Sequence, residues 1–330
     1  MKGHLLLWLL ILICGVAPAV WAQQHAAPHV VVSIKPIHSL VAAVMEGVGE
    51  PQLLIKGAGS PHGYALRPSE AQMLADAALV VWVGEELETF LQRPLATLGK
   101  SAQQLELADH LQDRMLPVRA GGAWEGHAHA HDDHDHKVDH HDPGHQDDHH
   151  SDDHKDAPFK SLNHHVWTSP LLAKDIVHLV AIALSDMDPS HQEQYGKNAA
   201  ELQKKLDQLY QEIRQQLAPV SSQPYIVFHD AYQYFERDFR LNAVGSVTID
   251  TERSPGARRI KEVREKITEL GARAVFSEPQ FQSRIVATVL EGTGAKTGVL
   301  DPLGVELPEG PEAYFSLIRA MGTNILDTLK

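Results

Sequence analysis

The sequence predicts an α/β protein made of two lobes joined by one long helix. Short apolar runs alternate with helical patterns between residues 30 and 84 and again beyond Pro224, and this alternation is typical of βαβ units with a mostly parallel sheet. The longest helical pattern of the chain lies between these two regions. With 330 residues, 43% of them apolar, the chain is long enough for two domains of ordinary size.

The amino-terminal region begins with the β-branched run VVVSI, which suits a buried strand. An apolar helix follows, and Pro36 opens it because proline is favoured at the first helical position. The expected elements are, in order, strand 30–34, helix 37–48, strand 51–56, helix 69–76 and strand 77–84.

Hydrophobic periodicity is lost between Ala120 and Pro158, where histidine and aspartate dominate. Residues 125–156 contain eleven acidic side chains and only two lysines. A segment this polar cannot bury enough apolar surface to offset the entropy of ordering it, so we expect a disordered surface loop over 120–158.

Order is expected to return at NHHVWTSP, where Thr168 or Ser169 can cap a helix that runs through Leu184. The longest pattern lies between Pro189 and Pro224, and at about 1.5 Å per residue it reaches on the order of 40 Å, enough to connect two domains rigidly. Its apolar positions recur at steps of three and four and are Tyr195, Ala199, Leu202, Leu206, Leu209, Ile213 and Leu217.

Beyond Pro224 the α/β pattern restarts, with strand 225–228, helix 232–237, strand 241–247, helix 255–270, strand 273–277, helix 283–291, strand 296–300 and a helix from Tyr314. The two lobes share no convincing sequence repeat. The predicted domains are a signal peptide at 1–22, an N-terminal lobe at 23–187 that includes the loop 120–158, a linker helix at 188–222 and a C-terminal lobe at 223–330.

The first residues predict export from the cytoplasm. Lys2 supplies a positive start, Leu5 to Val16 is almost wholly apolar but too short to span a membrane, and cleavage is expected after Ala22. The only cysteine, Cys14, lies inside this signal, so the mature chain should be soluble, without a disulfide or a thiolate ligand. The net charge of −14 argues against nucleic acid or anionic lipid as a partner.

Three histidines stand in loops beside predicted strands: His62 in GSPHGYALRPSE, His165 in NHHVWTSP and His229 in YIVFHDAY. Ligands of α/β sheets bind outside the carboxyl ends of the strands, and His229 directly follows a strand. The three are too far apart in sequence to form a local metal motif, so each alone could also be an incidental polar residue.

Six segments occur in an order that resembles the ZnuA family, the zinc-specific periplasmic binding proteins of ABC uptake systems. They are GSPHGYALRPSE, ALVVWVGEELE, NHHVWTSP, FHDAYQYFE, FSEPQF and LDPLG, and they cover nearly the whole predicted mature chain. The resemblance implies two Rossmann-like lobes joined by one rigid linker helix, with a metal site in the interlobe cleft and a His-rich loop over its entrance.

Carried over from this family, the metal ligands are His62, His165 and His229, whereas His164 falls at a position that is not a ligand. Zinc binds imidazole nitrogen in a roughly tetrahedral shell, and three histidines leave one place open. Related manganese transporters carry a carboxylate in place of the third histidine, so His229 favours zinc, although copper or nickel could also bind in vitro. Ala274 stands where some relatives have a cysteine, which removes a disulfide but none of these ligands.

The fourth ligand stays open between water, Asp301 of LDPLG and a residue of the His-rich loop. Glu278 of FSEPQF is a candidate to accept a ring N–H and orient a ligand, or else a surface glutamate paired with an arginine. Arg67 and Asp230 are interpreted as structural residues that hold loops by hydrogen bonds. Because ligand histidines must be neutral, zinc affinity should fall as the pH drops through about 6.5.

The loop 120–158 is interpreted as an accessory collector or sensor that binds several divalent ions weakly, with a solvated spacer as the alternative. Its candidate weak metal ligands are His127, His129, His131, His134, His136, His140, His141, His145, His149, His150 and His154.

The predicted function is high-affinity binding of Zn²⁺ in the periplasm and its delivery to an ABC permease, and through that permease to the cytoplasmic ATPase. We expect a monomer that opens by a small tilt or a loop motion, with a periplasmic zinc chaperone as a further candidate partner. An enzyme is disfavoured, since the chain has no His-Glu-x-x-His helix and neither Ser39 nor Ser277 sits in a nucleophile elbow. An adhesin or a metal-storage protein is the remaining alternative.

Overall fold

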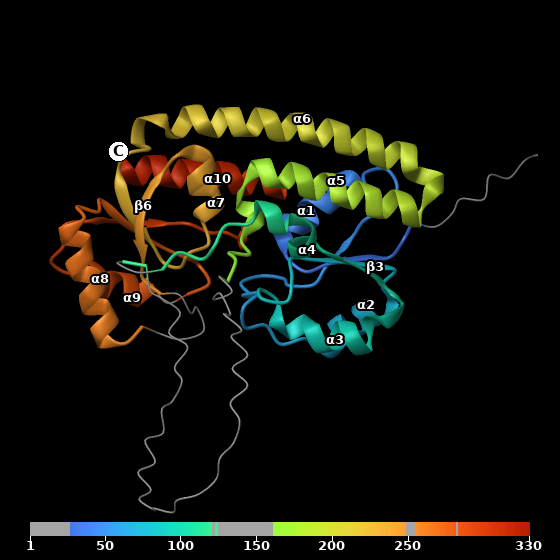
Figure 1. Ribbon diagram of the computed structural model, residues 1–330, viewed down its shortest axis with the longest axis horizontal. Helices are drawn as coiled ribbons and strands as arrows, with labels where there is room; N and C mark the ends of the chain where they lie inside the picture. Colours follow the sequence, from blue (N-terminus) through green and yellow to red (C-terminus); the bar gives the residue numbers. More distant parts are fainter. Residues whose placement is uncertain (1–26, 121–122, 125–160, 249–254, 282) are drawn as a thin grey trace, which may run out of the picture.

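The computed structural model describes residues 27–120, 123–124, 161–248, 255–281 and 283–330 (Figure 1). The predicted signal peptide, nearly all of the loop 120–158 and its eleven histidines lie outside these residues. What the sequence predicts for them therefore stays a prediction.

The N-terminal lobe contains a four-stranded parallel sheet in the order β2-β1-β3-β4. Its elements are β1 (Val30–Val32), α1 (Lys35–Val44), β2 (Gln52–Leu53), α2 (Pro68–Asp76), β3 (Leu79–Trp82), α3 (Gln92–Thr97), β4 (Gln103–Glu106) and α4 (Leu107–Leu111). The strands β1 and β3 are wholly buried, as their apolar runs require. The elements α3, β4 and α4 were not predicted from the sequence.

The C-terminal lobe repeats this topology with a second four-stranded parallel sheet, in the order β6-β5-β7-β8. Its elements are β5 (Pro224–Val227), α7 (Gln233–Phe239), β6 (Asn242–Ser246), α8 (Ala257–Glu269), β7 (Ala274–Ser277), α9 (Ser283–Leu290), β8 (Lys296–Val299) and α10 (Ala313–Leu329). The two sheets therefore share a strand order that the sequence did not reveal as a repeat.

Two long helices follow one another between the two sheets in the chain, and the second of them connects the lobes. Helix α5 (Pro170–Met187) begins at Ser169, whose Oγ accepts a hydrogen bond from the Leu172 N–H at 3.0 Å, so Ser169 rather than Thr168 is the cap. Helix α6 (Gln192–Leu217) follows and runs over both sheets in Figure 1, with α5 and α10 beneath it. All seven apolar positions predicted for this helix are buried. Among the described residues, no helix has the length and apolarity needed to cross a bilayer.

The two lobes share one continuous hydrophobic core. It extends from β1 and α1 through α5 and α6 to α7 and α10, and α1 of the N-terminal lobe packs directly against α10 of the C-terminal lobe. Separating the lobes as rigid bodies would expose this shared apolar surface to water. That exposure costs about 25 cal/mol of free energy for each Å². The core therefore opposes a wide opening of the cleft.

A buried lysine adds a polar contact between the lobes. The Lys35 ammonium, at the start of α1, donates to the carbonyl oxygens of Gly304 at 2.7 Å, Val305 at 2.9 Å and Leu307 at 2.8 Å. These three acceptors use all three N–H donors of the ammonium group. The residue is only 7% exposed, so this clamp fixes the loop after β8 against the N-terminal lobe.

Replacing Lys35 with methionine should destabilise the protein, because K35M keeps most of the side-chain volume and leaves three carbonyl groups without their donor. A buried polar group that loses its partner costs about 1–3 kcal/mol, so we expect unfolding to become about 2–5 kcal/mol easier in urea. The matched variant K56M changes an exposed lysine and should shift stability by less than about 0.5 kcal/mol. Equal urea midpoints for the two variants would contradict the clamp.

Candidate metal centre

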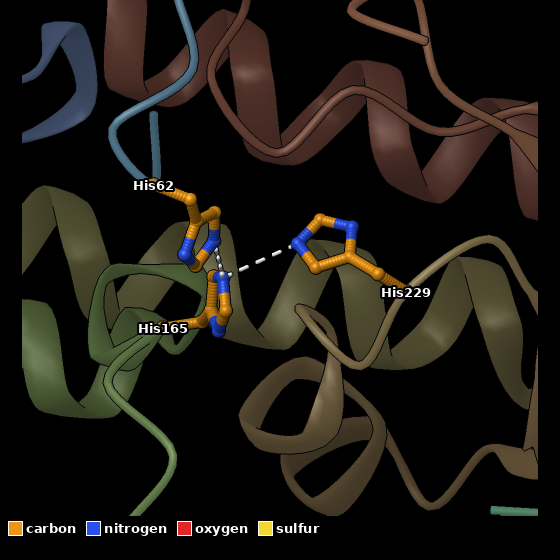
Figure 2. A group of neighbouring side chains, drawn as sticks. All are labelled: His62, His165 and His229. Atoms are coloured by element: carbon orange, nitrogen blue, oxygen red, sulfur yellow. Dashed lines mark hydrogen bonds between the residues drawn. The ribbon is translucent and has the colours of Figure 1, made fainter. Parts of the chain in front are cut away.

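Three loops place the candidate histidines at one point between the lobes. His62 lies in the loop between β2 and α2, and His165 begins the short 3-10 turn Val166–Thr168 that leads into α5. His229 lies two residues after the end of β5, at the carboxyl end of its sheet, where α/β proteins bind their ligands. Figure 2 shows the three imidazole rings converging from these separate segments.

The distances between the rings match a tetrahedral metal shell. Nε2 of His165 lies 3.2 Å from Nε2 of His62 and 3.3 Å from Nε2 of His229. Zinc–imidazole bonds of about 2.0–2.1 Å at tetrahedral angles place two ligand nitrogens about 3.3 Å apart. Among the described residues, these three histidines are the group with metal-ligand geometry, with one ligand atom of each within 4.8 Å of the others.

Glu278 sets the tautomer of His229. Its Oε1 lies 2.6 Å from Nδ1 of His229, and both side chains are buried. A carboxylate accepts hydrogen bonds, so Nδ1 carries the proton and Nε2 presents its lone pair to the centre. The structure thus places Glu278 in the orienting position suggested by the sequence, next to a ligand rather than on the surface.

Asn163 acts in the same way on His165, and sequence reasoning did not single it out. Its Oδ1 lies 2.9 Å from Nδ1 of His165, so this ring also presents an unprotonated Nε2. With the proton on Nδ1 of each ring, the Nε2 atoms of His165 and His229 present their lone pairs to each other at 3.3 Å. A cation placed between the two atoms would be coordinated by both.

Burial keeps two of the three imidazoles neutral. His165 and His229 are 8% and 5% exposed, and His62 is partly exposed. Burial, followed by repulsion from His229 and His164, lowers the pKa of His62 to about 3. Burial and the neighbouring histidines likewise lower the pKa of His165 well below its usual value. Both rings are therefore neutral at neutral pH, which is the state that binds a metal.

Asp301 is not part of the group of three histidines, and its carboxylate binds the loop that follows β8. Its Oδ1 accepts from the N–H groups of Leu303 and Gly304, both at 3.0 Å, and from Nε2 of Gln280 at 2.8 Å. Its Oδ2 accepts from the Val305 N–H at 2.6 Å. The carboxylate thus organises the loop that Lys35 clamps, because the backbone N–H groups after β8 compete successfully for its oxygens.

Other residues noted in the sequence lie outside the group. The Nδ1 of His164 lies 2.9 Å from the Leu162 carbonyl oxygen, away from the centre. The Asp230 carboxylate pairs with the Arg119 guanidinium, and Arg67 is an exposed residue whose guanidinium lies 3.8 Å from Glu70. Asp230 and Arg67 therefore have the kind of loop contacts expected of structural residues.

Two serines considered for a nucleophilic triad have backbone partners instead. Ser39 Oγ donates to the Pro311 carbonyl and accepts from the Tyr314 N–H, and Ser277 Oγ donates to the Gly298 carbonyl.

A cavity of about 200 Å³ opens onto the three histidines. Its wall includes Val118, Arg119 and the segment from Ser161 to His165, so the chain on both sides of the loop 120–158 borders it. This volume holds several water molecules at about 30 Å³ each. The cavity therefore gives a hydrated ion access to the ring nitrogens.

A buried group of three imidazoles between two parallel-sheet lobes, bridged by one helix, defines a metal-binding protein of the solute-binding class. The family described as ZnuA, zinc-uptake complex component A, periplasmic, matches residues 30–328. The chain therefore belongs to the ZnuA family, and both this family and zinc as its cargo were correctly predicted from the sequence.

Named relatives support the assignment of this chain to the ZnuA family. The high-affinity zinc uptake system protein ZnuA of Brucella abortus strain 2308 is 46% identical over 304 residues, which cover 91% of each chain. The protein of the same name from Yersinia pestis is 34% identical over 308 residues, which cover 92% of each chain.

Solved structures support the fold. A crystal structure of ZnuA superimposes with a TM-score of 0.72 at 23% identity, over 92% of this chain and all of that one. A zinc-bound ZnuA that lacks its residues 138–173 gives a TM-score of 0.71 at 22% identity, over 92% of this chain and 98% of that one. The laminin-binding adhesin of Streptococcus agalactiae also gives 0.72, at 24% identity over 92% of this chain and all of that one. These likenesses confirm the two-lobed α/β architecture.

The lowered pKa values of His62 and His165 change the expected pH dependence of zinc binding. Three histidines of ordinary pKa, about 6.5, would take up protons together as the pH falls. The slope of log zinc affinity against pH would then approach three. A lowered pKa keeps a ring neutral at a pH where an ordinary histidine is already protonated. These two rings should therefore not weaken zinc binding between pH 7 and 5, and the slope should be about one or less. Calorimetry in buffers of different ionisation enthalpy counts the protons, and release of about two or more per zinc at pH 5 would refute this.

Proposed function

We propose that this chain captures Zn²⁺ in the periplasm with His62, His165 and His229 as ligands and delivers it to an ABC permease. The observation that carries the proposal is that Nε2 of His165 lies 3.2 Å from Nε2 of His62 and 3.3 Å from Nε2 of His229, close to the spacing of ligands in a tetrahedral zinc site. The relatives named high-affinity zinc uptake system protein ZnuA support zinc as the cargo.

The chemistry of the ligands favours zinc over harder ions. The three-ligand group offers imidazole nitrogen only, and manganese prefers oxygen ligands. Glu278 strengthens the donor character of His229 through its hydrogen bond without itself entering the group. We propose water from the adjoining cavity as the fourth ligand, because Asp301 is occupied by four hydrogen bonds.

Zinc release would proceed by loop motion rather than by wide lobe opening. The shared core and the Lys35 clamp oppose separation of the N-terminal lobe (23–187) from the C-terminal lobe (223–330). The linker helix (188–222) extends across both lobes. The ring of His62 has His165 as its hydrogen-bond partner among the described residues. The loop that carries His62 can therefore withdraw without breaking a bond to an orienting side chain.

The partners follow from the family. An ABC permease with its cytoplasmic ATPase would receive the ion, and a periplasmic zinc chaperone could supply it. We propose a monomer, exported by a signal cleaved after Ala22, that binds no nucleic acid and catalyses no reaction. The loop 120–158 would act as an accessory collector of metal, since its eleven histidines can bind ions weakly in changing geometries.

Replacing His229 with alanine should abolish tight zinc binding, because it removes one of three ligands and leaves Glu278 without its partner. Loss of a residue behind a ligand costs roughly 10–100-fold in metal affinity, so loss of the ligand itself should cost more than about 100-fold. H178A alters an exposed histidine of α5 and is the matched control, expected to bind like the native protein. Competition with a zinc-sensitive fluorescent chelator measures both. Native affinity in H229A would refute the assigned site.

Deletion of residues 125–156 should remove weak zinc binding and leave one tight equivalent. The described site keeps all three ligands and both orienting side chains in such a variant. Calorimetric titration of the native protein and the deletion variant compares the stoichiometries. Disappearance of the tight equivalent with the loop would place the main site in that segment instead.

A further inference from the structure

Asn163 has every polar group of its side chain engaged at the metal centre. The residue is 4% exposed. Its Oδ1 accepts from the backbone N–H of His165 at 3.1 Å as well as from Nδ1 of the same residue at 2.9 Å. Its Nδ2 donates to the Asp230 carbonyl at 2.8 Å and to Oε1 of Gln233 at 3.0 Å. A buried amide with four partners has one orientation in which all are satisfied.

Backbone partners determine that orientation. The His165 N–H can only donate and the Asp230 carbonyl can only accept, so the oxygen of Asn163 must face His165. Rotation of the amide by 180° would break both bonds at once. The proton on Nδ1 of His165 is therefore imposed by groups that cannot themselves change protonation.

The same amide joins the ligand-bearing loops of the two lobes. Asn163 precedes α5 and lies two residues from His165, whereas Asp230 directly follows His229 and Gln233 begins α7 of the C-terminal lobe. Arg119 holds the Asp230 carboxylate from the other side. One side chain thus controls both the tautomer of His165 and the distance between His165 and His229.

We propose that Asn163 is a positioning residue of the zinc site: its oxygen selects the Nε2 lone pair of His165 for the metal, and its NH₂ group ties that ligand to the His229 loop. This inference rests on the proposed zinc-binding function. It adds a residue that touches no metal and yet decides how the two lobes present their ligands. The two halves of the amide have separate roles, so two substitutions can separate them.

In N163L, both roles are lost with little change in volume. The His165 ring then has no acceptor that selects its tautomer, and the loops lose their cross-lobe bond. We expect a mixture of His165 tautomers and zinc affinity about 10–100-fold weaker, the range for residues that orient metal ligands. In N163D, an oxygen still accepts from His165, but the second oxygen faces the Asp230 carbonyl without a proton to donate. We expect the native tautomer and faster zinc dissociation than in the native protein.

The experiment combines two readouts on the full chain. Long-range ¹H–¹⁵N spectra of the metal-free protein report the His165 tautomer without zinc, and chelator competition gives the zinc dissociation rate and affinity. N198L is the matched control, because the Asn198 amide likewise donates two hydrogen bonds, here to the backbone carbonyls of Val44 at 2.9 Å and Glu46 at 2.8 Å. It should leave the tautomer and zinc binding unchanged.

The outcomes separate this inference from the proposed function. Native tautomer and native affinity in N163L would overturn the positioning role even if H229A loses zinc. Equal losses in N163L and N163D with an unchanged tautomer would reduce Asn163 to a structural residue and also overturn it. Should N163L fail to fold, N163D decides, since a native zinc dissociation rate there would remove the cross-lobe role. Native zinc affinity in H229A would instead refute the proposed site.

Discussion

The proposed zinc site depends on holding the imidazoles of His165 and His229, from different lobes, with their Nε2 atoms 3.3 Å apart. These atoms come from separate loops, so the scaffold must supply the restraint. The shared core, the Lys35 clamp and the bond from Trp167 Nε1 to the Pro302 carbonyl at 2.7 Å provide it. Long helix α6 extends over both sheets and adds its buried stripe to the same core. The metal-binding geometry is therefore a property of how the lobes pack.

The three ligands are unequal in how they are oriented. His229 is backed by a carboxylate, His165 by an amide, and His62 mainly by His165 itself. A carboxylate raises the basicity of its imidazole partner more than a neutral amide does, so His229 is the strongest donor. Capture and release make opposite demands on a transport protein. Two firmly held ligands in the core and a third on a less restrained loop meet both demands without disturbing the packing of the lobes.

Parts of the fold escaped sequence reasoning for identifiable reasons. Strand β4 contains one buried residue, Leu105, and lies at the edge of its sheet, so no apolar run marks it. Pairing with β3, rather than an apolar pattern of its own, holds β4 in an extended conformation. Asp301 was one of three candidates for the fourth ligand, and the N–H groups of its own loop bind it. Asn163 lies inside the NHHVWTSP segment, and nothing in the sequence marks it, since an asparagine has no metal chemistry of its own.

The sequence by itself determined the alternation of strands and helices, the apolar stripe of the linker, the three histidines and the family, because periodicity and motif residues are local properties of the chain. Only the tertiary structure decided which nitrogen of His165 and of His229 faces the group of histidines and that Glu278 contacts this group. Those choices depend on partners distant in sequence, because Glu278 lies 49 residues from His229 and the Asp230 carbonyl that orients the Asn163 amide lies 67 residues from Asn163. Hydrogen-bond direction at such range is set by packing, and no local pattern encodes it.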